Sequence, residues 1–562
     1  MAKLIPLLRL RIVLIAIPVG AIASLVTLCF REVLLWINQG LFGGRTDITS
    51  AMQVWPWYLW PLIVAVGGVL AGVILQYALT LEKRYRLPTD YLEVINARLD
   101  AIPTRPSLLR AFSALASIAS GASIGKEGPM VQLSALSGSL LKKYLPIRWQ
   151  LETTDLVAMA AAAGLAAVYH APLAAAIFLA EIAFGVLALQ RLVPLIIASC
   201  SAVLTLRCLG YRSALYPLSE LHFSLNTMTI SLAILAGLLS GFVGCLFIWL
   251  TTIVRSQFKK IPSLPVRLGT GGLIVGLLSL LTPAILGNGY DVIVSIIHGR
   301  YLLPALLVIL VLKLFATVCS VGSGAVGGMF TPSLLIGASL GGVVGVVALS
   351  LGLPAGSPWL FAAIGMASVL AAMSQAPLMA ILMVLEMTMN SSLLLPLMLA
   401  SSIATLVAFR FQKGVSYSLV STHFSKSTAK FGFDHTSIRD LVIEGATLQP
   451  QELVSKALAL SSIKRERYVY VIDENDQFLG VVSIHNIASQ VLSGQLTLSS
   501  PVSLVIEVDF PCIYQDQTLR EGWEAFTQLT LERLPVLDNP TQRKLVGALT
   551  KTSIIQRAGS FM

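Results

Sequence analysis

The sequence predicts an all-α polytopic membrane domain with interrupted helices, followed by a smaller α/β region. Three observations support this fold class. The 562-residue chain is 56% hydrophobic and only 12% charged, whereas soluble proteins carry about a quarter charged residues. The hydrophobic character stops near Arg410. The regions before and after this point each contain an internal repeat, which indicates two separately built parts.

Long apolar runs recur along the first 410 residues and predict transmembrane helices, because a hydrocarbon core of roughly 30 Å needs about 20 helical residues. Other apolar segments are short or broken by glycine, so the sequence does not fix an exact number of spans. The candidate spans are Ile12–Leu34, Trp55–Leu79, Thr227–Val254, Leu268–Ile285, Leu302–Val321, Pro332–Leu351, Trp359–Leu385 and Leu393–Ala408.

Basic residues near the first two spans predict the topology. Lys3, Arg9 and Arg11 precede the first apolar run, which is too long for a cleaved signal peptide. Five more lysines and arginines lie between residues 82 and 105, after the second span. Both segments therefore face the cytoplasm. Such loops account for most of the net charge of +11, so no nucleic-acid partner is implied. The short loops favour a bacterial inner membrane, with the tail in the cytoplasm.

The cysteines indicate neither a disulfide framework nor a metal site. None of the six has CxxC spacing, and most lie in or near apolar spans, so we interpret them as small core residues. They are Cys29, Cys200, Cys208, Cys245, Cys319 and Cys512.

The membrane region repeats itself at an interval of about 205 residues. "HAPLAAAIFLAE" at 170–181 matches "QAPLMAILMVLE" at 375–386. Upstream in each half lies a glycine-rich break that ends in proline, at 125–129 and at 327–332. Paired broken helices in two halves of a transporter point to a substrate site near the membrane midplane.

Broken helices suit the binding of an anion. Irregular backbone occurs at membrane depth only where protein or a water-filled cavity surrounds it. The start of a helix presents N–H groups without partners and a partial positive charge. Several such ends bind an anion weakly enough to let it leave again. The competing interpretation is close packing of helices through small residues, which two matched breaks ending in proline disfavour.

The motifs "GKEGP" at 125–129 and "GGMFTP" at 327–332, in this order along the chain, resemble two signature motifs of the CLC family of chloride channels and chloride–proton antiporters, and "GNGYD" at 287–291 resembles the family's turn between the two halves. The resemblance implies a homodimer in which each subunit has its own pore, which lies between two inverted repeats. It also implies that the protein is a transport protein and not an enzyme. Its substrate would be chloride, and coupled members of the family move protons as well.

The resemblance assigns roles to individual residues. Glu127 matches the gating glutamate, whose carboxylate occupies an anion site until it is protonated or displaced by chloride. Met329 and Phe330 match residues whose amides line the central chloride site, and Tyr417 matches the tyrosine whose hydroxyl contacts the same ion from inside. We expect no ion pair between Glu127 and Lys126, because neighbouring residues on a helix point in different directions.

The sequence departs from the family pattern at two places. The early serine motif is replaced by "YRLPTDYLE", so the chloride-contacting serine falls on Leu87 or, with a small gap, on Thr89. Coupled members often carry an inner proton-transferring glutamate, and this position is Ile182, after Glu181. The first departure leaves the anion preference open. The second favours channel-like or loosely coupled transport, with stoichiometric antiport as the alternative.

The tail contains two similar units. "GVVSIHNI" at 480–487 matches "GALTKTSI" at 547–554. Each copy follows a predicted helix and a valine-rich strand, which are residues 451–463 and 468–472 in the first unit and 519–529 and 534–537 in the second. The tail therefore predicts two tandem β-α-β units.

These units resemble a pair of CBS domains, at 436–495 and 500–562, after a membrane domain at 1–425. Such pairs often bind adenine nucleotides through an acidic residue that holds the ribose. The matching positions are Asn486 and Ser553, which lack the acid. Two interpretations stay open, a nucleotide site and a dimerisation or gating module that binds no ligand.

An intramembrane hydrolase is a remote alternative function. Ser323 and His170 both lie in apolar surroundings, and a serine–histidine dyad is a known nucleophilic arrangement. The counterpart of His170 in the second half is Gln375, which indicates a polar capping or packing role in place of catalysis.

Overall fold

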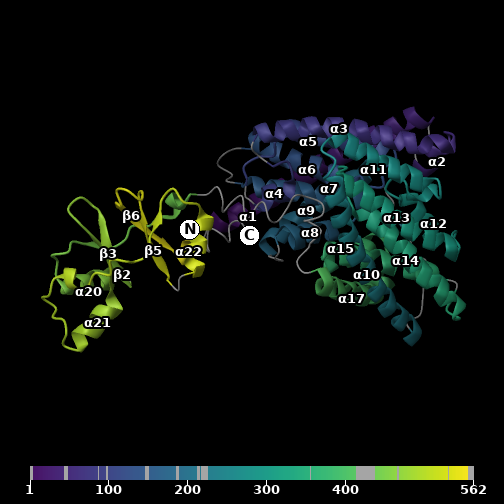
Figure 1. Ribbon diagram of the computed structural model, residues 1–562. Helices are drawn as coiled ribbons and strands as arrows, with labels where there is room; N and C mark the ends of the chain where they lie inside the picture. Colours follow the sequence, from purple (N-terminus) through teal and green to yellow (C-terminus); the bar gives the residue numbers. More distant parts are fainter. Residues whose placement is uncertain are drawn as a thin grey trace. The chain divides into compact units, whose positions relative to one another are not determined.

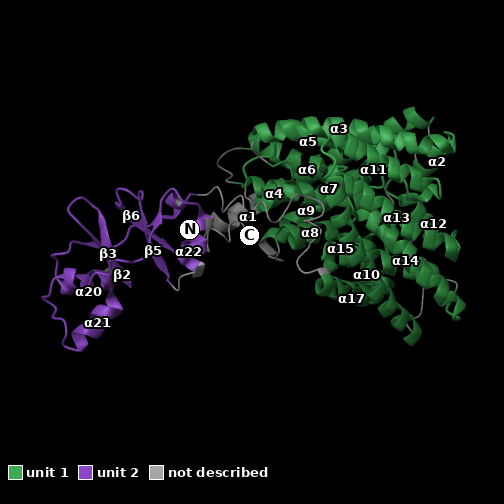
Figure 2. Cartoon of the chain, in the orientation of Figure 1, with its two compact units in different colours: residues 1–424 green, residues 425–562 purple. Residues whose placement is uncertain are grey.

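The computed structural model describes residues 4–43, 48–85, 88–96, 99–145, 151–184, 189–211, 215–216, 226–354, 356–412, 437–464, 467–528 and 531–554. The chain forms two compact units, Met1–Phe424 and Ser425–Met562 (Figure 2). Within the described residues, the first unit is helical and the second carries the strands (Figure 1). The assignment of residues 436–495 and 500–562 as CBS units stays a prediction.

The first half of the membrane unit runs from α1 to α9. Its helices are α1 (Leu4–Phe42), α2 (Ile48–Met52), α3 (Trp60–Tyr85), α4 (Tyr91–Asn96), α5 (Thr104–Ala119), α6 (Glu127–Leu141), α7 (Thr153–Tyr169), α8 (Pro172–Phe178) and α9 (Leu189–Cys208). Short 3₁₀ turns lie at η1 (Trp57–Leu59) and η2 (Lys142–Tyr144), and a π-turn lies at η4 (Leu179–Ala183).

The second half runs from α10 to α17. Its helices are α10 (Thr227–Phe258), α11 (Leu264–Ser279), α12 (Tyr290–Ile297), α13 (Leu303–Ser323), α14 (Phe330–Ser350), α15 (Ser357–Ser374), α16 (Pro377–Thr388) and α17 (Leu394–Gln412). The 3₁₀ turns η5 (Pro283–Ile285) and η6 (Ser391–Leu393) precede α12 and α17.

Among the described residues, eight helices are long and apolar enough to cross a membrane, which confirms the polytopic membrane domain. Most of the predicted spans lie within these helices. The eight segments are Ile12–Phe42, Trp57–Tyr85, Arg191–Cys208, Thr227–Phe258, Leu303–Ser323, Phe330–Ser350, Ser357–Ser374 and Ser391–Phe411.

Two of the predicted spans were wrong, and one span was not predicted. The predicted span Trp359–Leu385 is two helices, α15 and α16, because Gln375 adopts a left-handed conformation and Pro377 cannot continue the preceding helix. The predicted span Leu268–Ile285 ends early, with α11 at Ser279. The sequence analysis also missed α9, in which a charged residue and an internal proline interrupt the apolar pattern.

The internal sequence repeat is also a structural repeat. The first break separates α5 from α6, and the second separates α13 from α14. His170 then ends α7 with φ 54°, and Gln375 ends α15 with φ 56°. The short helices α8 and α16 follow, each with proline in its first turn. This arrangement agrees with the capping role that the pairing of His170 with Gln375 predicted.

Small residues allow close contact between α14 and α15. A Cβ atom added at Gly341 would overlap the carbonyl oxygen of Phe361, and one added at Gly337 would overlap that of Gly365. Close approach of this kind brings backbones into van der Waals contact, which drives helix association where lipid removes the hydrophobic contribution. The glycines of these two helices therefore serve close packing. Gly125 and Gly328 in the breaks instead leave room for the side chain of Glu127.

The second unit contains two three-stranded sheets of the same design, in the orders β1-β2-β3 and β4-β5-β6. In each sheet the first pairing is parallel and the second is antiparallel. The elements are β1 (Thr447–Leu448), α20 (Val454–Lys464), β2 (Tyr468–Ile472), β3 (Phe478–Ser483), α21 (Ile484–Leu492), β4 (Ile513–Tyr514), α22 (Leu519–Gln528), β5 (Arg533–Leu537) and β6 (Leu545–Thr550). The predicted helices and strands agree with these bounds within a few residues.

The two sheets pack against each other. Backbone bridges join Gln477 to Lys544 and Ile443 to Ala548. Side chains from both sheets share one buried cluster, formed by Tyr470, Phe478, Val481, Leu537 and Ala548. The tail is therefore one compact unit built from two similar halves.

Candidate functional site

The two glycine-rich breaks of the membrane unit meet in space. The amide of Gly125 donates to the carbonyl of Gly328 at 2.8 Å, and the amide of Gly328 donates back to the carbonyl of Gly125 at 2.8 Å. Both residues are glycines, and a Cβ atom added at either one would meet the Glu127 side chain beside this junction. The breaks predicted from the sequence thus form one structure, which places the starts of α6 and α14 side by side.

Glu127 is the first residue of α6, and its side chain lies against the start of α14. The side chain is buried, with 1% of the residue exposed. Its Oε1 accepts a hydrogen bond from the amide of Thr331 at 3.1 Å, and its Oε2 accepts one from the Thr331 hydroxyl at 3.2 Å. An anionic group is favoured there by the N–H groups and the dipole of the helix. The carboxylate therefore occupies an anion-binding position.

Glycines on both sides leave room for this carboxylate. A Cβ atom added at Gly125 would overlap both oxygens of Glu127, and one added at Gly328 would overlap Oε1. The glycines therefore form a cradle with the dimensions of a carboxylate group. The same residues supply the reciprocal backbone bonds, so the cradle and the junction of the breaks are one feature.

Met329 and Phe330 lie beside the bound carboxylate, at the N-cap and first position of α14. Both are buried. The ring of Phe330 packs edge-on against Phe178, with centroids 5.2 Å apart. The hydroxyl of Tyr169 lies 2.9 Å from the Thr331 hydroxyl, so a tyrosine also contributes to this site.

Tyr417, the predicted contact from the inner side, lies outside the described residues. Its role stays a prediction.

Lys126 and Glu127 turn away from each other. Glu127 reaches α14, whereas Lys126 lines a cavity that it shares with Arg31 of α1. No ion pair joins Lys126 to Glu127 within the part of the chain that the structure describes. The expectation from helix geometry is therefore correct.

A buried lysine that the sequence analysis missed holds the loop before α12. Lys313 on α13 donates through Nζ to the carbonyls of Ile285, at 2.9 Å, and Gly287, at 2.7 Å. The amide of Gly287 donates in turn to the carbonyl of Gly121, at 3.2 Å. The "GNGYD" segment is thus tied to the end of the first break by Gly121 and to α13 by Lys313. A single cation in the apolar span Leu302–Val321 was the signal that could have identified it.

Glu181 and Glu386 are the last residues of the two repeated segments, and each caps a helix of the opposite half. Glu386 accepts hydrogen bonds from the amides of Leu173 at 3.1 Å and Ala174 at 2.9 Å, in the first turn of α8. Glu181 accepts one from the amide of Met379 at 3.0 Å, in the first turn of α16. Carboxylates satisfy amides there that have no partner within the helix. The exchange locks the two halves together.

Ile182 lies in the π-turn η4, directly after Glu181. Its side chain packs against the large hydrophobic core. π-turns are rare and are often found at functional sites, so the position is structurally distinct. The residue there nevertheless supplies no group that transfers a proton.

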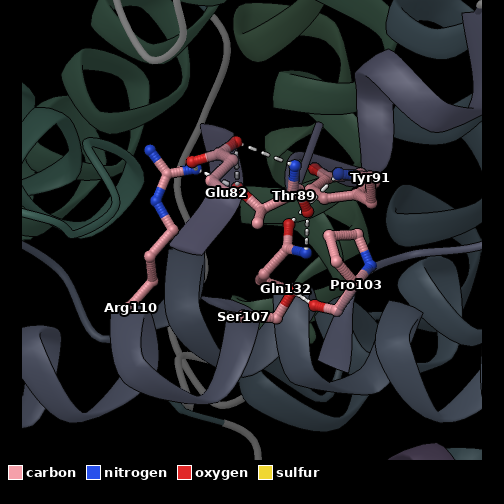
Figure 3. A network of polar contacts seen from close by, with 7 residues as sticks. All are labelled: Glu82, Thr89, Tyr91, Pro103, Ser107, Arg110 and Gln132. Carbon is pink, nitrogen blue, oxygen red and sulfur yellow. Dashed lines mark hydrogen bonds and ion pairs between the residues drawn. The ribbon is translucent and has the colours of Figure 1, made fainter. Parts of the chain in front are cut away.

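Thr89 belongs to a polar network with Glu82, Arg110 and Gln132 (Figure 3). Its hydroxyl donates to Glu82 Oε1 at 3.0 Å and accepts a hydrogen bond from Arg110. Its amide also donates to Glu82 Oε1, at 3.1 Å, and its carbonyl accepts from the Gln132 amide. Glu82 and Arg110 form an ion pair at 3.8 Å. The Thr89 hydroxyl is therefore already engaged, and chloride contact there would require rearrangement. Leu87, the other candidate, lies outside the described residues.

The structure does not bring the serine and histidine of the hydrolase alternative together. The hydroxyl of Ser323 donates to the carbonyl of Ser320 at 2.8 Å. His170 lines the cavity beside Lys126. No hydrogen bond joins Ser323 to His170 among the described residues, so the geometry of a dyad is missing.

Comparisons with known proteins agree with this geometry. The family model described as voltage gated chloride channel matches residues 67–409. A protein of Ralstonia nicotianae whose name describes a ClcB-like chloride channel is 40% identical over 389 residues, which are 68% of this chain and 90% of that protein.

Two solved structures share the fold. A slow cyanobacterial Cl⁻/H⁺ antiporter has a TM-score of 0.62 at 24% identity and covers 73% of this chain and 97% of its own. A eukaryotic CLC transporter has a TM-score of 0.59 at 18% identity and covers 97% of this chain and 98% of its own. The second likeness extends over the C-terminal unit as well.

The exchanged caps generate a prediction about stability. We expect Glu386→Gln to lower the free energy of unfolding by about 1–2 kcal/mol, because the amides of Leu173 and Ala174 lose a charged acceptor. Glu181→Gln, at the matching position, should lower it as well. The measurement is the thermal unfolding midpoint of the purified protein. Glu474→Gln, in an exposed turn, is the control, and a Glu386→Gln midpoint equal to that of the control would contradict the capping role.

Proposed function

Because the chain belongs to the voltage-gated chloride channel family, we propose that it moves chloride across a membrane along a path gated by Glu127. One observation carries this proposal. The Glu127 carboxylate lies in the glycine cradle and accepts hydrogen bonds from Thr331 at the start of α14. A carboxylate is an anion, so it takes the place of a chloride ion there. Protonation removes its charge and therefore its affinity for the site.

The chloride ion itself is then held by weak dipolar contacts. We propose that the amides of Met329 and Phe330 line its site and that the hydroxyl of Tyr417 contacts it from the inner side. Main-chain amides and helix ends bind an anion without a full positive charge, which keeps the residence of each ion short. The burial of Met329 and Phe330 beside Glu127 supports this assignment.

We propose channel-like or loosely coupled movement of chloride. Tight coupling to protons needs a chain of groups that carry them from the cytoplasm to Glu127. Ile182 interrupts such a chain, and its neighbour Glu181 holds the start of α16. The competing proposal is stoichiometric chloride–proton antiport. Some solved structures of this fold are antiporters, but at 24% identity they support the fold alone.

We also propose the cellular setting. Integral membrane character follows from the apolar helices. The basic residues Lys3, Arg9 and Arg11 favour a cytoplasmic N-terminus, and the tail is then cytoplasmic too. A related bacterial protein supports a bacterial cell membrane. We propose that two copies of the chain assemble in it, as the family resemblance implies.

The tail is proposed to act as a packing or gating module that binds no adenine nucleotide. Both positions that would hold a ribose are engaged internally. The side-chain amide of Asn486 donates to Glu507 Oε1 at 2.6 Å, and the Ser553 hydroxyl donates to the Thr550 carbonyl at 2.8 Å. Glu507 also brings a negative charge to the first position, which would repel phosphate groups.

Simultaneous measurement of chloride and proton flux in liposomes tests the gate. We expect chloride flux through the unmodified protein to rise as the pH falls, because protonation neutralises Glu127. Glu127→Gln should lose this pH dependence and all proton movement, and its chloride flux should equal or exceed that of the unmodified protein. A folded Glu127→Gln variant without chloride flux would count against the gating role. Robust proton pumping by a chloride gradient in the unmodified protein would favour antiport.

The cradle allows a second test of the gate. In Gly328→Ala, the three atoms nearest the added Cβ all belong to the Glu127 side chain, so we expect the methyl group to displace the carboxylate. We expect chloride flux at neutral pH to rise about tenfold, the equivalent of ~1.4 kcal/mol of lost carboxylate binding.

In a Glu127→Ala background, Gly328→Ala should have no further effect on chloride flux. Gly40→Ala, whose added Cβ meets no atom within 4 Å, is the control. A Gly328→Ala protein that is stable and slower than the unmodified protein would contradict displacement of the gate.

The proposal for the tail predicts that the full-length protein shows no saturable binding of ATP in calorimetric titration at millimolar concentrations. Glu507→Gln removes the repelling charge and is the matched variant. Saturable binding to the unmodified protein that Asn486→Ala abolishes would show that the tail is a nucleotide site.

A further inference from the structure

A group of basic residues lies where α10 ends and α11 begins, and we call it the basic corner. Between Glu220 and Asp291 the chain has four lysines and arginines and no acidic residue. The four are Arg255 in the last turn of α10, Lys259 and Lys260 in the connection that follows, and Arg267 in the first turn of α11. The proposed path of the ion and its gate leave these residues without a role.

The basic corner lies on the cytoplasmic side in the predicted topology. Helix α11 runs antiparallel to α3, because a Cβ atom added at Gly276 would meet Pro61 at the start of α3, and one added at Gly72 would meet Pro265 at the start of α11. The start of α11 therefore lies toward the same side as the end of α3. Basic residues in the last turn of α3 favour the cytoplasm for that side.

Exposed apolar side chains flank the basic corner. Ile253 on α10 and Val266 on α11 are both exposed. Trp249, six residues before Arg255, is exposed as well, and tryptophans of transmembrane helices concentrate at the membrane–water interface. The basic corner therefore lies near the level at which phospholipid headgroups meet their acyl chains.

The side chain of Arg267 gives a second, independent sign of a ligand. Its Nε atom is buried and has no hydrogen-bond partner among the described residues, and it forms no ion pair in that part of the chain. A buried N–H group without an acceptor is costly. Arg267 and Arg255 are also close enough for their charges to repel each other. An anion between two such cations relieves both costs, because it accepts hydrogen bonds and offsets the repulsion.

We propose that the basic corner binds the headgroup phosphate of an anionic phospholipid from the cytoplasmic leaflet. Arg255 and Arg267 hold the phosphate oxygens, because the planar guanidinium group matches the geometry of phosphate. The two lysines of the connection are exposed and add positive potential at the membrane surface. The acyl chains lie against Ile253 and Val266. Clusters of four or more basic residues at the cytoplasmic end of a membrane helix are typical of this kind of lipid recognition.

A bound headgroup also lies beside the second break. A Cβ atom added at Gly324, where α13 ends, would be 3.5 Å from Nη2 of Arg267. The lipid therefore supports the end of α13 through Arg267. Lipid binding at this surface is independent of the proposed function, since the basic corner does not include the residues of the gate.

Native mass spectrometry of the full-length protein in detergent, titrated with phosphatidylglycerol or with phosphatidylcholine, tests the site. We expect phosphatidylglycerol to bind more tightly than phosphatidylcholine. Arg255→Gln and Arg267→Gln should each weaken the binding of phosphatidylglycerol about fivefold, as the loss of one basic residue at a membrane surface does. The double variant Lys259→Gln/Lys260→Gln should weaken it as well, and its exposed positions keep the test decisive if an arginine variant fails to fold.

The matched control is Lys83→Gln/Arg84→Gln, which removes two exposed charges from the cytoplasmic end of α3. It should leave the affinity for phosphatidylglycerol unchanged. An equal loss of affinity in this control would show a general attraction to negative surfaces and would overturn the site. Equal affinities of the unmodified protein for the two lipids would also overturn it.

The thermal unfolding midpoint provides a second readout, because a ligand that binds the folded protein stabilises it. Phosphatidylglycerol should raise the midpoint of the unmodified protein, and this rise should shrink in Arg267→Gln. Inorganic phosphate at millimolar concentrations should neither raise the midpoint nor displace the lipid, because it lacks acyl chains. Saturable binding of inorganic phosphate that displaces phosphatidylglycerol would assign the basic corner to free phosphate and overturn the lipid. None of these readouts depends on chloride flux.

Discussion

The pair of hydrogen bonds between Gly125 and Gly328 is the contact on which the membrane unit depends. Each bond joins backbone to backbone, and the absence of side chains at both glycines leaves room for the Glu127 side chain beside the junction. The contact sets the distance between the starts of α6 and α14, and this distance gives the Glu127 carboxylate its partners on α14. If the two breaks moved apart, the charge would lose both its cradle and its hydrogen bonds. A buried carboxylate without such partners is strongly unfavourable.

Polar groups inside the membrane unit connect its two halves in pairs. The hydroxyl of Ser123 contacts that of Thr317 at 3.1 Å, beside the glycine junction. The amide of Gly287, in the loop that Lys313 holds, donates to the carbonyl of Gly121, and Glu181 and Glu386 exchange helix caps. Each of these groups satisfies backbone or hydroxyl partners that lipid could not satisfy. The helices themselves are held by small residues and close contact, so the polar pairs supply the specificity of the arrangement.

The sequence predicted features that local chemistry determines. Glycine and proline marked both breaks, and the repeat of Ala-Pro-Leu marked α8 and α16. The span Trp359–Leu385 was wrong because hydropathy alone does not register a turn at Gln375. The partners of Thr89, Lys313 and the two capping glutamates come from distant parts of the chain, and a single sequence does not specify such contacts.

The left-handed residues that end α7 and α15 have a consequence for engineering. His170 and Gln375 have φ values of 54° and 56°, a region that costs a residue with a side chain about 1 kcal/mol and glycine almost nothing. Glycine at either position would thus be the conformationally easier choice, and a search for thermostable variants would find it early. His170 also faces the cavity beside Lys126. A gain in rigidity there would come with the loss of a polar side chain from the wall of this cavity.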